Sequence, residues 1–383
     1  MTYSLLSSVY ISQLSLEETS HLFAINHIPT SDLLISHSTM TTSTSYIQHE
    51  RDGKQVLLKG QAQLPSRKPH QSLVKVQYVA QNPTDVQTLD SNAFGEGTVL
   101  GCDFVGTVEE EGTEAKNLSK GDVIAGLIWG AEIKGLGAYG SHTFADDRIS
   151  FKVPKSVKLE DAATLPLASC TAWLALFSKT CLNIPRKEGK TSVLIWGGSS
   201  SVGSYAIQLA RIYNFNILTT CSPKNFSMVK NLGATHVFDY NDPSVIDNIK
   251  NAASDLEYTF DTIGSKDSSA QASQAIRSEG GVLCTVRPGK ANTENVAKHV
   301  KITDVLVWTA FLKDHQYKEF KWPASVEDHE LSAELFEKLP SWLENGTIKP
   351  NNVKLFDSLD SIHEGFDMHR NGKISSFKIV YKV

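Results

Sequence analysis

Residues 192–203 read SVLIWGGSSSVG, which combines an apolar strand, a turn of small residues and the start of a helix. The helix continues over Val202–Tyr213 with apolar residues at helical spacing. A pyrophosphate binds where backbone N–H groups at a helix N-terminus are free and no side chain stands in the way. Gly198 supplies the tight turn and Gly203 allows close packing, whereas Ser200 takes the place of the usual second glycine. The stretch therefore predicts a dinucleotide-binding turn, with an ordinary strand-to-helix turn as the alternative.

The segments around this turn alternate between strands and helices. We expect strands at Ser192–Trp196, Asn216–Thr220, His236–Tyr240, Tyr258–Ile263 and Gly281–Val286. Helices are expected between them. Such alternation is typical of a parallel sheet covered by helices on both faces. The fold class is therefore α/β, with a doubly wound parallel sheet in the middle of the chain.

The residues on either side of this sheet read mainly as β structure. Ser72–Ala80 alternates apolar and polar residues, as a half-buried strand does, and Gly101–Glu110 and Val123–Trp129 are further expected strands. Near the C-terminus a helix is expected around Leu331–Glu344, followed by a strand over Ser376–Lys382. We expect this last strand to return to an irregular, barrel-like unit formed by the N-terminal strands.

The residues after the second strand of the sheet bear on the choice of dinucleotide. An NAD site usually has Asp or Glu there, which accepts hydrogen bonds from the ribose 2′-hydroxyl. Residues 220–225 read TCSPKN and contain no acid. Ser222 and Asn225 can donate hydrogen bonds, and Lys224 adds positive charge, so the segment predicts NADP(H) as the cofactor. The alternative is a solvated helix start with a chance lysine.

The composition limits the possible functions. A chain of 383 residues is too long for one simple core, so two domains are expected. The net charge of −5 argues against a protein that holds nucleic acid through its overall field. No apolar run reaches the ~20 residues of a membrane-spanning helix. The cysteines are widely spread and form no CxxC pair, which favours a reducing compartment and a cytoplasmic protein.

Residues 1–45 differ from the rest of the chain. Ser and Thr crowd the end of this stretch, acidic residues are present, and no Lys or Arg precedes Arg51. A secretory signal needs a basic start, and a mitochondrial presequence is rich in Arg and poor in acids. We therefore expect a disordered extension over 1–45, with a short docking helix around Leu14–Ile25 as the alternative.

Several segments resemble the medium-chain dehydrogenase/reductase superfamily. The resemblance is greatest to its zinc-independent quinone-oxidoreductase-like branch and to the trans-acting enoyl reductases of fungal polyketide synthases. It extends from about residue 46 to the end of the chain. The segments that carry it are Asn82–Asp85 (NPTD), Leu100–Gly106 (LGCDFVG), Leu118–Val123 (LSKGDV), Ala162–Pro166 (AATLP), the turn at 192–203, Thr220–Phe226 (TCSPKNF), Gly233–Tyr240 (GATHVFDY) and Phe260–Gly264 (FDTIG).

This resemblance implies a Rossmann doubly wound parallel sheet inserted in a GroES-like β-barrel domain. The implied domains are a GroES-like substrate domain over 46–165, a Rossmann NADP-binding domain over 166–315 and a return to the GroES-like domain over 316–383. The implied contacts to the nicotinamide half come from Thr84, Asp85, Val86 and Gln87. Those to the pyrophosphate come from Ser200, Ser201, Val202 and Gly203.

The resemblance also implies the remaining contacts. Around the adenosine phosphate it places Ser222, Pro223, Lys224, Asn225 and Tyr240. Further cofactor contacts are Val286 and Arg287 after the fifth strand, and Ile374 and Ser375 from the C-terminal end. The helix that would border an acyl-substrate pocket comprises Ala172, Trp173, Leu174, Ala175, Leu176, Phe177, Ser178 and Lys179.

Metal binding is not expected. Zinc alcohol dehydrogenases of this superfamily have a cysteine in an early loop and a Gly-His-Glu motif, whereas this chain has Asn82 and Cys102-Asp103 at those places. A third ligand at suitable spacing is missing, and so is a four-cysteine structural lobe. Without a Lewis acid, alcohol oxidation is disfavoured. Reduction of an activated C=C bond or a quinone needs only hydride delivery and oxyanion stabilisation.

We therefore expect an NADPH-dependent oxidoreductase that reduces an activated C=C bond in a small-molecule or acyl-thioester substrate. A polyketide synthase is a candidate partner, and the chain would be a monomer or homodimer without nucleic-acid or membrane partners. The alternatives are an NADPH:quinone or enone reductase in detoxification, and a nonenzymatic dinucleotide-binding protein. No general acid is assigned, because Tyr139 is more readily interpreted as packing under a loop and His142 as a surface histidine.

Overall fold

The computed structural model describes residues 41–187, 191–317 and 320–383. The expected extension therefore lies outside the described residues up to position 40, as does the alternative docking helix. At positions 42–45 the expectation of disorder is wrong, because these residues belong to strand β1 (Thr42–Arg51). Ser43 and Ser45 are buried while Thr42 and Thr44 are exposed. This alternation is that of a half-buried strand, although its residues are polar.

A parallel sheet occupies the middle of the chain, in the strand order β10–β9–β8–β11–β12–β13. Neighbouring strands all pair in parallel. Read in chain order, the arrangement is the doubly wound one in which ligands bind where the strand order reverses, here between β8 and β11. The predicted α/β class is thereby confirmed. The strands are β8 (Ser192–Trp196), β9 (Asn216–Thr220), β10 (His236–Phe238), β11 (Tyr258–Asp261), β12 (Gly281–Thr285) and β13 (Val300–Asp304).

Helices cover both faces of this sheet. They are α3 (Pro166–Phe177), α4 (Ser201–Ile212), α5 (Phe226–Leu232), α6 (Val245–Ala252) and α7 (Ser268–Gln274), with short turns η1 (Pro223–Asn225), η2 (Pro288–Lys290) and η3 (Val307–Ala310). Val193 and Ile195 of β8 pack with α3 and α4, whereas Leu194 and Trp196 pack with α6 and α7. A strand buried on both faces needs a continuous apolar run, which explains the sequence SVLIW.

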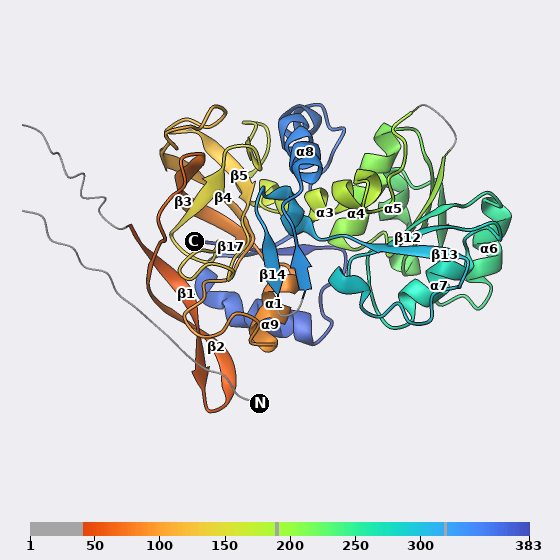
Figure 1. Cartoon of the computed structure of the whole chain (residues 1–383), viewed down its shortest axis with the longest axis horizontal. Helices are drawn as coiled ribbons and strands as arrows, with labels where there is room; N and C mark the ends of the chain where they lie inside the picture. The colour runs from red at the N-terminus through yellow and green to blue at the C-terminus, as the bar shows by residue number, and fades with distance from the viewer. Residues whose placement is uncertain (1–40, 188–190, 318–319) are drawn as a thin grey trace, which may run out of the picture. The chain divides into compact units, whose positions relative to one another are not determined.

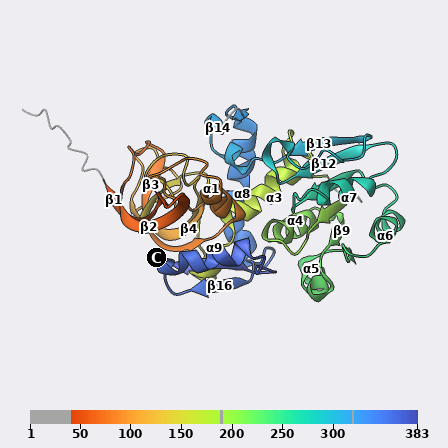
Figure 2. The same ribbon diagram turned by 90° about the horizontal axis from the view of Figure 1, so that it is seen from below.

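Strands from both ends of the chain form a second sheet, ordered β16–β17–β3–β4–β5–β7, with β6 paired to β3. The strand β17 runs antiparallel to β3, with Tyr381 opposite Val79, so the predicted return of the C-terminal strand is confirmed. Figure 2 shows β16 and helix α9 (Ile362–Arg370) beside the N-terminal strands. The other bounds are β3 (Gln71–Ala80), β4 (Asp103–Glu110), β5 (Val123–Leu127), β6 (His142–Asp146), β7 (Ser150–Lys152), β16 (Val353–Phe356) and β17 (Lys378–Lys382).

We call this sheet and the elements packed on it the N-terminal lobe, and Figure 1 shows its strands β3, β4, β5 and β17 together. The remaining elements are β2 (Lys54–Gln63), α1 (Pro83–Asp90), α2 (Leu159–Ala162), β14 (His315–Tyr317), β15 (Phe320–Trp322), α8 (Val326–Glu344) and η4 (Leu359–Ser361). Helix α8 begins earlier than predicted because Ser325 Oγ accepts a hydrogen bond from Asp328 N and caps it. Within the described ranges, no helix is long and apolar enough to cross a bilayer.

Candidate dinucleotide and substrate site

The turn after β8 exposes backbone N–H groups at the start of α4. Ser200 Oγ accepts a hydrogen bond from Gly203 N at 2.9 Å and caps the helix. Among the described residues no partner is found for the N–H groups of Ser201 and Val202. Such orphan groups lie at the positive end of the helix dipole and favour an anion. Ser200 Oγ also lies 2.9 Å from Thr262 Oγ1, which joins the ends of β8 and β11 at the point where the strand order reverses.

Two positions in this turn require glycine, because atoms of neighbouring residues lie too close for a side chain. A Cβ on Gly203 would lie 2.4 Å from Gly197 O, and a Cβ on Gly198 would lie 2.1 Å from Thr219 Oγ1. Contacts this short between non-bonded atoms force the backbone to shift. The turn therefore keeps its shape only with glycine at these places, as the pyrophosphate interpretation requires.

A cavity of about 210 Å³, named the dinucleotide cavity below because Val202 at the start of α4 lines it, brings together predicted residues from separate parts of the chain. Arg287 Nη1 donates a hydrogen bond to Gln87 Oε1 at 3.2 Å, so the segment after β12 contacts α1 across the cavity. The predicted residues on its walls are Thr84, Gln87, Val202, Val286 and Arg287. The other wall residues were not among the predicted site residues, namely Asn82, Pro83, Leu167, Thr171, Thr262, Ile263, Pro288 and Val305–Trp308. The motif at Phe260–Gly264 was a signal for two of them, Thr262 and Ile263.

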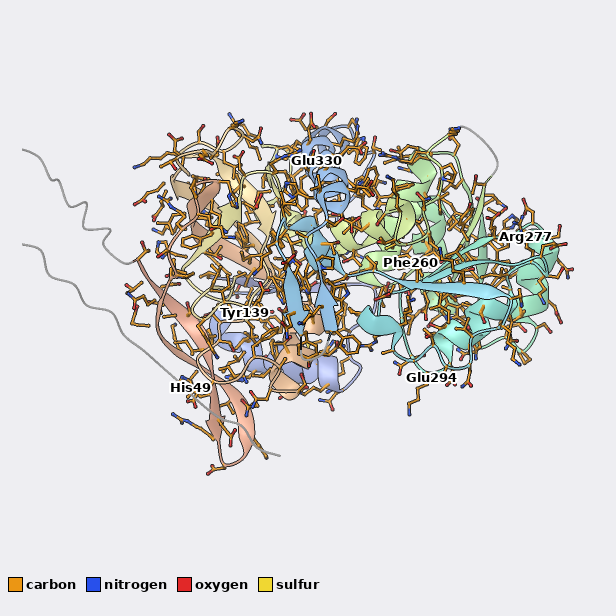
Figure 3. The ribbon with its side chains drawn as sticks, viewed as in Figure 1. His49, Tyr139, Phe260, Arg277, Glu294 and Glu330 are labelled. Atoms are coloured by element: carbon orange, nitrogen blue, oxygen red, sulfur yellow. The ribbon has the colours of Figure 1, made fainter. Side chains whose placement is uncertain are left out.

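Two residues expected beside the nicotinamide face the interior instead. Val86 is buried in the apolar cluster of the N-terminal lobe. Asp85 is 2% exposed, and its Oδ2 accepts hydrogen bonds from Tyr139 OH at 2.9 Å and from Asn82 N at 2.7 Å. Figure 3 labels Tyr139 within the N-terminal lobe, where it is fully buried, in agreement with its interpretation as a packing residue. Asp85 and Val86 thus hold α1 in place rather than line the cavity.

The buried carboxyl of Asp85 makes folding stability depend on pH. Burial raises its pKa to about 6, against hydrogen bonds from Asn82, Tyr139 and Cys102 that favour the charged form. An unfolded aspartate titrates near 3.9, so the folded chain binds more protons between these values. Stability from this group is therefore present at low pH and lost as the pH rises through about 6.

We expect Asp85→Asn to remove this dependence. Wild-type protein should lose roughly 2–3 kcal/mol of unfolding free energy from this group between about pH 4 and 7, and the variant should not. Urea unfolding of both proteins across that range measures the difference. Parallel stability curves for the two proteins would show that folding does not raise the pKa of Asp85.

The segment after β9 presents polar groups at the surface. Ser222 Oγ and Tyr240 OH lie 3.4 Å apart, and Lys224 in η1 is exposed. No ion pair joins Lys224 to another described residue. Pro223 is exposed beside it, whereas Asn225 is buried and accepts a hydrogen bond from Ser376 Oγ at 2.7 Å. Ser222, Lys224 and Tyr240 remain accessible to a ligand, while Asn225 anchors the C-terminal segment.

The two residues predicted to contact the cofactor from the C-terminal end lie just before β17. Ile374 is half-buried against the apolar cluster of the N-terminal lobe, and Ser375 is exposed. Ser376 has a φ of 60°, which turns the chain just before β17 and directs its side chain to Asn225. Neither Ile374 nor Ser375 lines the dinucleotide cavity.

The helix expected to border the substrate pocket is largely buried in the core. Residues 172–176 are at most 1% exposed, and Trp173 Nε1 donates a hydrogen bond to Leu331 O inside the core. Phe177 packs against Trp173, Ser178 bonds Asp328, and Lys179 pairs with Glu327, all away from the dinucleotide cavity. Leu167 and Thr171, earlier on α3, line that cavity instead. The sequence of α3 is apolar or small all round, so its periodicity could not show which residues face a ligand.

A buried ammonium occupies the place considered for a metal. Lys378 on β17 is 3% exposed, and its Nζ lies 2.6 Å from Asp103 Oδ2 and 2.9 Å from Asn82 Oδ1. Asp103 also accepts hydrogen bonds from Asn82 Nδ2 at 2.8 Å and from Leu167 N at 2.6 Å. Cys102 donates to Asp85, and burial raises the pKa of its thiol. In the part of the chain that the structure describes, no group of three or more His, Cys, Asp or Glu could hold a metal.

Comparison with known proteins identifies relatives with this organisation. Residues 68–155 match the family described as alcohol dehydrogenase GroES-like domain, and residues 201–320 match the family described as zinc-binding dehydrogenase. Trans-enoyl reductase ACTTS2 of Alternaria alternata is 32% identical over 84% of this chain and 94% of its own length. Trans-enoyl reductase eqxC of Fusarium heterosporum is 33% identical over 81% and 90%. A zinc-type alcohol dehydrogenase-like protein of Schizosaccharomyces pombe is 33% identical over 83% and 94%.

Solved structures with the same fold include two reductases. The quinone oxidoreductase from Coxiella burnetii superposes with a TM-score of 0.67 at 22% identity, covering 90% of this chain and all of that one. The CurK enoyl reductase superposes with a TM-score of 0.69 at 18% identity, covering 88% and 99%. These likenesses show the fold, and the trans-enoyl reductases show the family. The chain is therefore an oxidoreductase of the medium-chain dehydrogenase/reductase superfamily, in its enoyl reductase group, with a fold that binds NAD(P).

Proposed function

We propose that this enzyme reduces an activated C=C bond with NADPH and without zinc. The observation that carries the proposal is the ammonium of Lys378, which stands between Asn82 and Asp103. Because the Lys378 ammonium lies 2.6 Å from Asp103 Oδ2, its positive charge would repel a metal ion at the same place. It also occupies a carboxylate oxygen that a metal would need as a ligand. Reduction of a C=C bond conjugated to a carbonyl does not require a Lewis acid, because protein donors can stabilise the oxyanion.

The accessible groups of the site fit the parts of NADPH. Ser201 and Val202 would meet the pyrophosphate with backbone N–H groups, and Ser222, Lys224 and Tyr240 would surround the 2′-phosphate. On the walls of the dinucleotide cavity, Thr84, Gln87, Val286 and Arg287 would contact the nicotinamide half. When bound, NADPH supplies the hydride.

One hydroxyl of the dinucleotide cavity is available to the substrate. Thr171 Oγ1 already donates to Leu167 O, and Thr262 Oγ1 donates to Trp196 O. Thr84 lines the same cavity, and its hydroxyl has no partner among the described residues. We therefore assign to Thr84 the donation of a hydrogen bond to the substrate oxygen on which charge develops. The proton that completes the reduction is left to water, since the described walls of the cavity contain no Asp, Glu, His or Tyr.

A panel of substrates tests the reaction. Purified enzyme should oxidise NADPH with trans-2-enoyl thioesters, keep this rate in the presence of a chelator, and contain no stoichiometric zinc. Alcohol oxidation together with one zinc per chain would contradict the proposal. Turnover of quinones and free enones alone would favour a detoxifying reductase, which the likeness in fold to a quinone oxidoreductase keeps as the second candidate. Tight NADPH binding without turnover would favour a nonenzymatic protein.

The cellular setting of the reaction forms part of the same proposal. Because several relatives are named trans-enoyl reductases, we propose a role in secondary metabolism, with a polyketide synthase presenting an acyl thioester. Cys102, Cys170, Cys181, Cys221 and Cys284 are all buried free thiols, which supports the proposed cytoplasmic location. Sedimentation of the purified chain, alone and with such a synthase, distinguishes monomer, homodimer and complex.

A further inference from the structure

A second cavity, of about 720 Å³, adjoins the dinucleotide cavity. The same segment of chain lines both, with Val305–Trp308 on the smaller cavity and Phe311–Lys313 on the larger one. Trp308 stacks on Trp129, with ring centroids 4.8 Å apart and an angle of 2° between the planes. Trp129 in turn lines the larger cavity. Each indole of the stacked pair therefore lines one of the two cavities.

The two cavities differ in what they can hold. Sites for small molecules usually have volumes of about 300–1,000 Å³. At about 210 Å³, the dinucleotide cavity is too small for the nicotinamide half and a long substrate together, whereas about 720 Å³ is within the usual range. We propose that the larger cavity is a substrate subsite that takes the apolar acyl chain of an enoyl thioester. This inference rests on the proposed function, since it extends the same site.

The walls of the larger cavity suit a hydrocarbon chain. The apolar side chains on them come from the N-terminal lobe and from the segment before β14: Ile128, Trp129, Ile133, Leu136, Phe144, Phe311 and Leu312. Ile133 is 37% exposed and Leu312 is 53% exposed, and large apolar side chains left in water at a cavity are typical of binding sites. Each methylene buried against such walls strengthens binding by roughly fourfold.

The charges around this cavity favour an uncharged occupant. The residues of its lining balance in sign, with Lys68, Lys116, Arg148 and Lys313 against Glu114, Glu132, Asp146 and Asp147. Arg148 is paired with Glu330 outside the lining. A phosphate-bearing thioester arm would be attracted by a surplus of cations, which the lining lacks. Of the two ends of such a substrate, the acyl chain therefore suits this cavity better than the phosphate-bearing arm.

An ion-pair bridge joins opposite walls of the same cavity. Glu132, in the loop after β5, lies 2.5 Å from Lys313 Nζ and 3.3 Å from His315 Nδ1. Burial alone would raise the pKa of Glu132, but hydrogen bonds from His315 and Lys313 hold it below its usual value. The bridge is thus charged near neutral pH and fixes the walls that would contact the chain.

The dependence of kcat/KM on the length of the acyl chain tests the proposed subsite. We expect kcat/KM for N-acetylcysteamine thioesters to rise by at least about tenfold from crotonyl to trans-2-octenoyl. Leu312→Asp and Ile133→Asp should each remove most of that gain and leave crotonyl turnover and NADPH affinity unchanged. Leu355→Asp is the matched control, because Leu355 is 42% exposed and lies outside this cavity. A gain that survives both variants overturns the proposal. An equal loss for crotonyl also overturns it, since the cavity would then hold the thioester arm.

A binding measurement keeps this test separate from catalysis. Saturated dodecanoyl and butanoyl thioesters can be titrated while tryptophan fluorescence is followed, because Trp129 forms part of the cavity wall. Tighter binding of the dodecanoyl compound that Leu312→Asp abolishes supports the subsite even if no thioester is reduced, in which case only the proposed function fails. Equal affinity for the two compounds rules the subsite out.

Discussion

Lys378→Met is expected to destabilise the folded chain by about 3–5 kcal/mol. The substitution keeps an unbranched, slightly shorter side chain but removes its charge, so the carboxylate of Asp103, which is 0% exposed, loses its ionic partner. A buried charge left without its partner costs far more than the pair contributes when intact, because its desolvation is no longer compensated. The effect should appear as a lower urea midpoint with an unchanged slope.

Two further variants make this expectation specific. Lys59→Met removes the partner of Asp360 from a pair at 2.8 Å in which both side chains are more than half exposed, so stability should hardly change. Lys378→Met combined with Asp103→Leu removes both charges and should recover much of the loss, because apolar replacements of buried pairs are often tolerated. If Lys378→Met costs no more than Lys59→Met, the buried pair does not stabilise the fold.

Lys224→Ala is expected to weaken NADPH binding by up to about a hundredfold, since hydrogen bonds to charged groups contribute about 1.5–3 kcal/mol. NADH has no 2′-phosphate, so its affinity should be unchanged. Lys224 is exposed and lies in η1 beside Ser222, whose hydroxyl is 3.4 Å from that of Tyr240. Fluorescence titration with both dinucleotides measures the ratio of the two affinities.

The matched control for this variant is Lys230→Ala. Lys230 is also exposed and lies at the end of α5, a short way along the chain from η1. Its removal lowers the net charge equally, so it should cost NADPH only a small, salt-dependent part of its affinity. Equal losses of NADPH and NADH affinity in Lys224→Ala would show that the residue does not recognise the 2′-phosphate.

Local pattern was enough to predict the elements of the central sheet. The strands Ser192–Trp196 and Asn216–Thr220 occur with the predicted bounds, and the glycine turn stands at the point where the strand order reverses. Apolar runs and turn residues determine structure over only a few positions, so they can be recognised in the sequence alone. The first four residues of the strand at Thr42–Arg51 escaped prediction because the buried positions among them are serines rather than apolar residues.

The direction in which each side chain points was harder to predict from the sequence. Thr84 and Gln87 line the dinucleotide cavity, whereas Asp85 and Val86 between them face the core, a split that follows from the helical turn of α1. For the expected substrate helix the sequence likewise gives no sign of which face would meet a ligand, because α3 is apolar or small on every side. The contact of Ser376 with Asn225 was not predicted, because it depends on a turn of positive φ just before β17.

The sequence by itself determined the α/β class, the position of the dinucleotide turn and the absence of an acid after β9, because each depends on neighbouring residues. Only the tertiary structure decided that Lys378 joins Asn82 and Asp103, which lie about 300 positions earlier in the chain. It also decided that Trp129 and Trp308, which line different cavities, stack on each other. Lys378 comes close to Asn82 and Asp103 because β17 pairs with β3, and no local pattern predicts a contact between residues so far apart in the sequence.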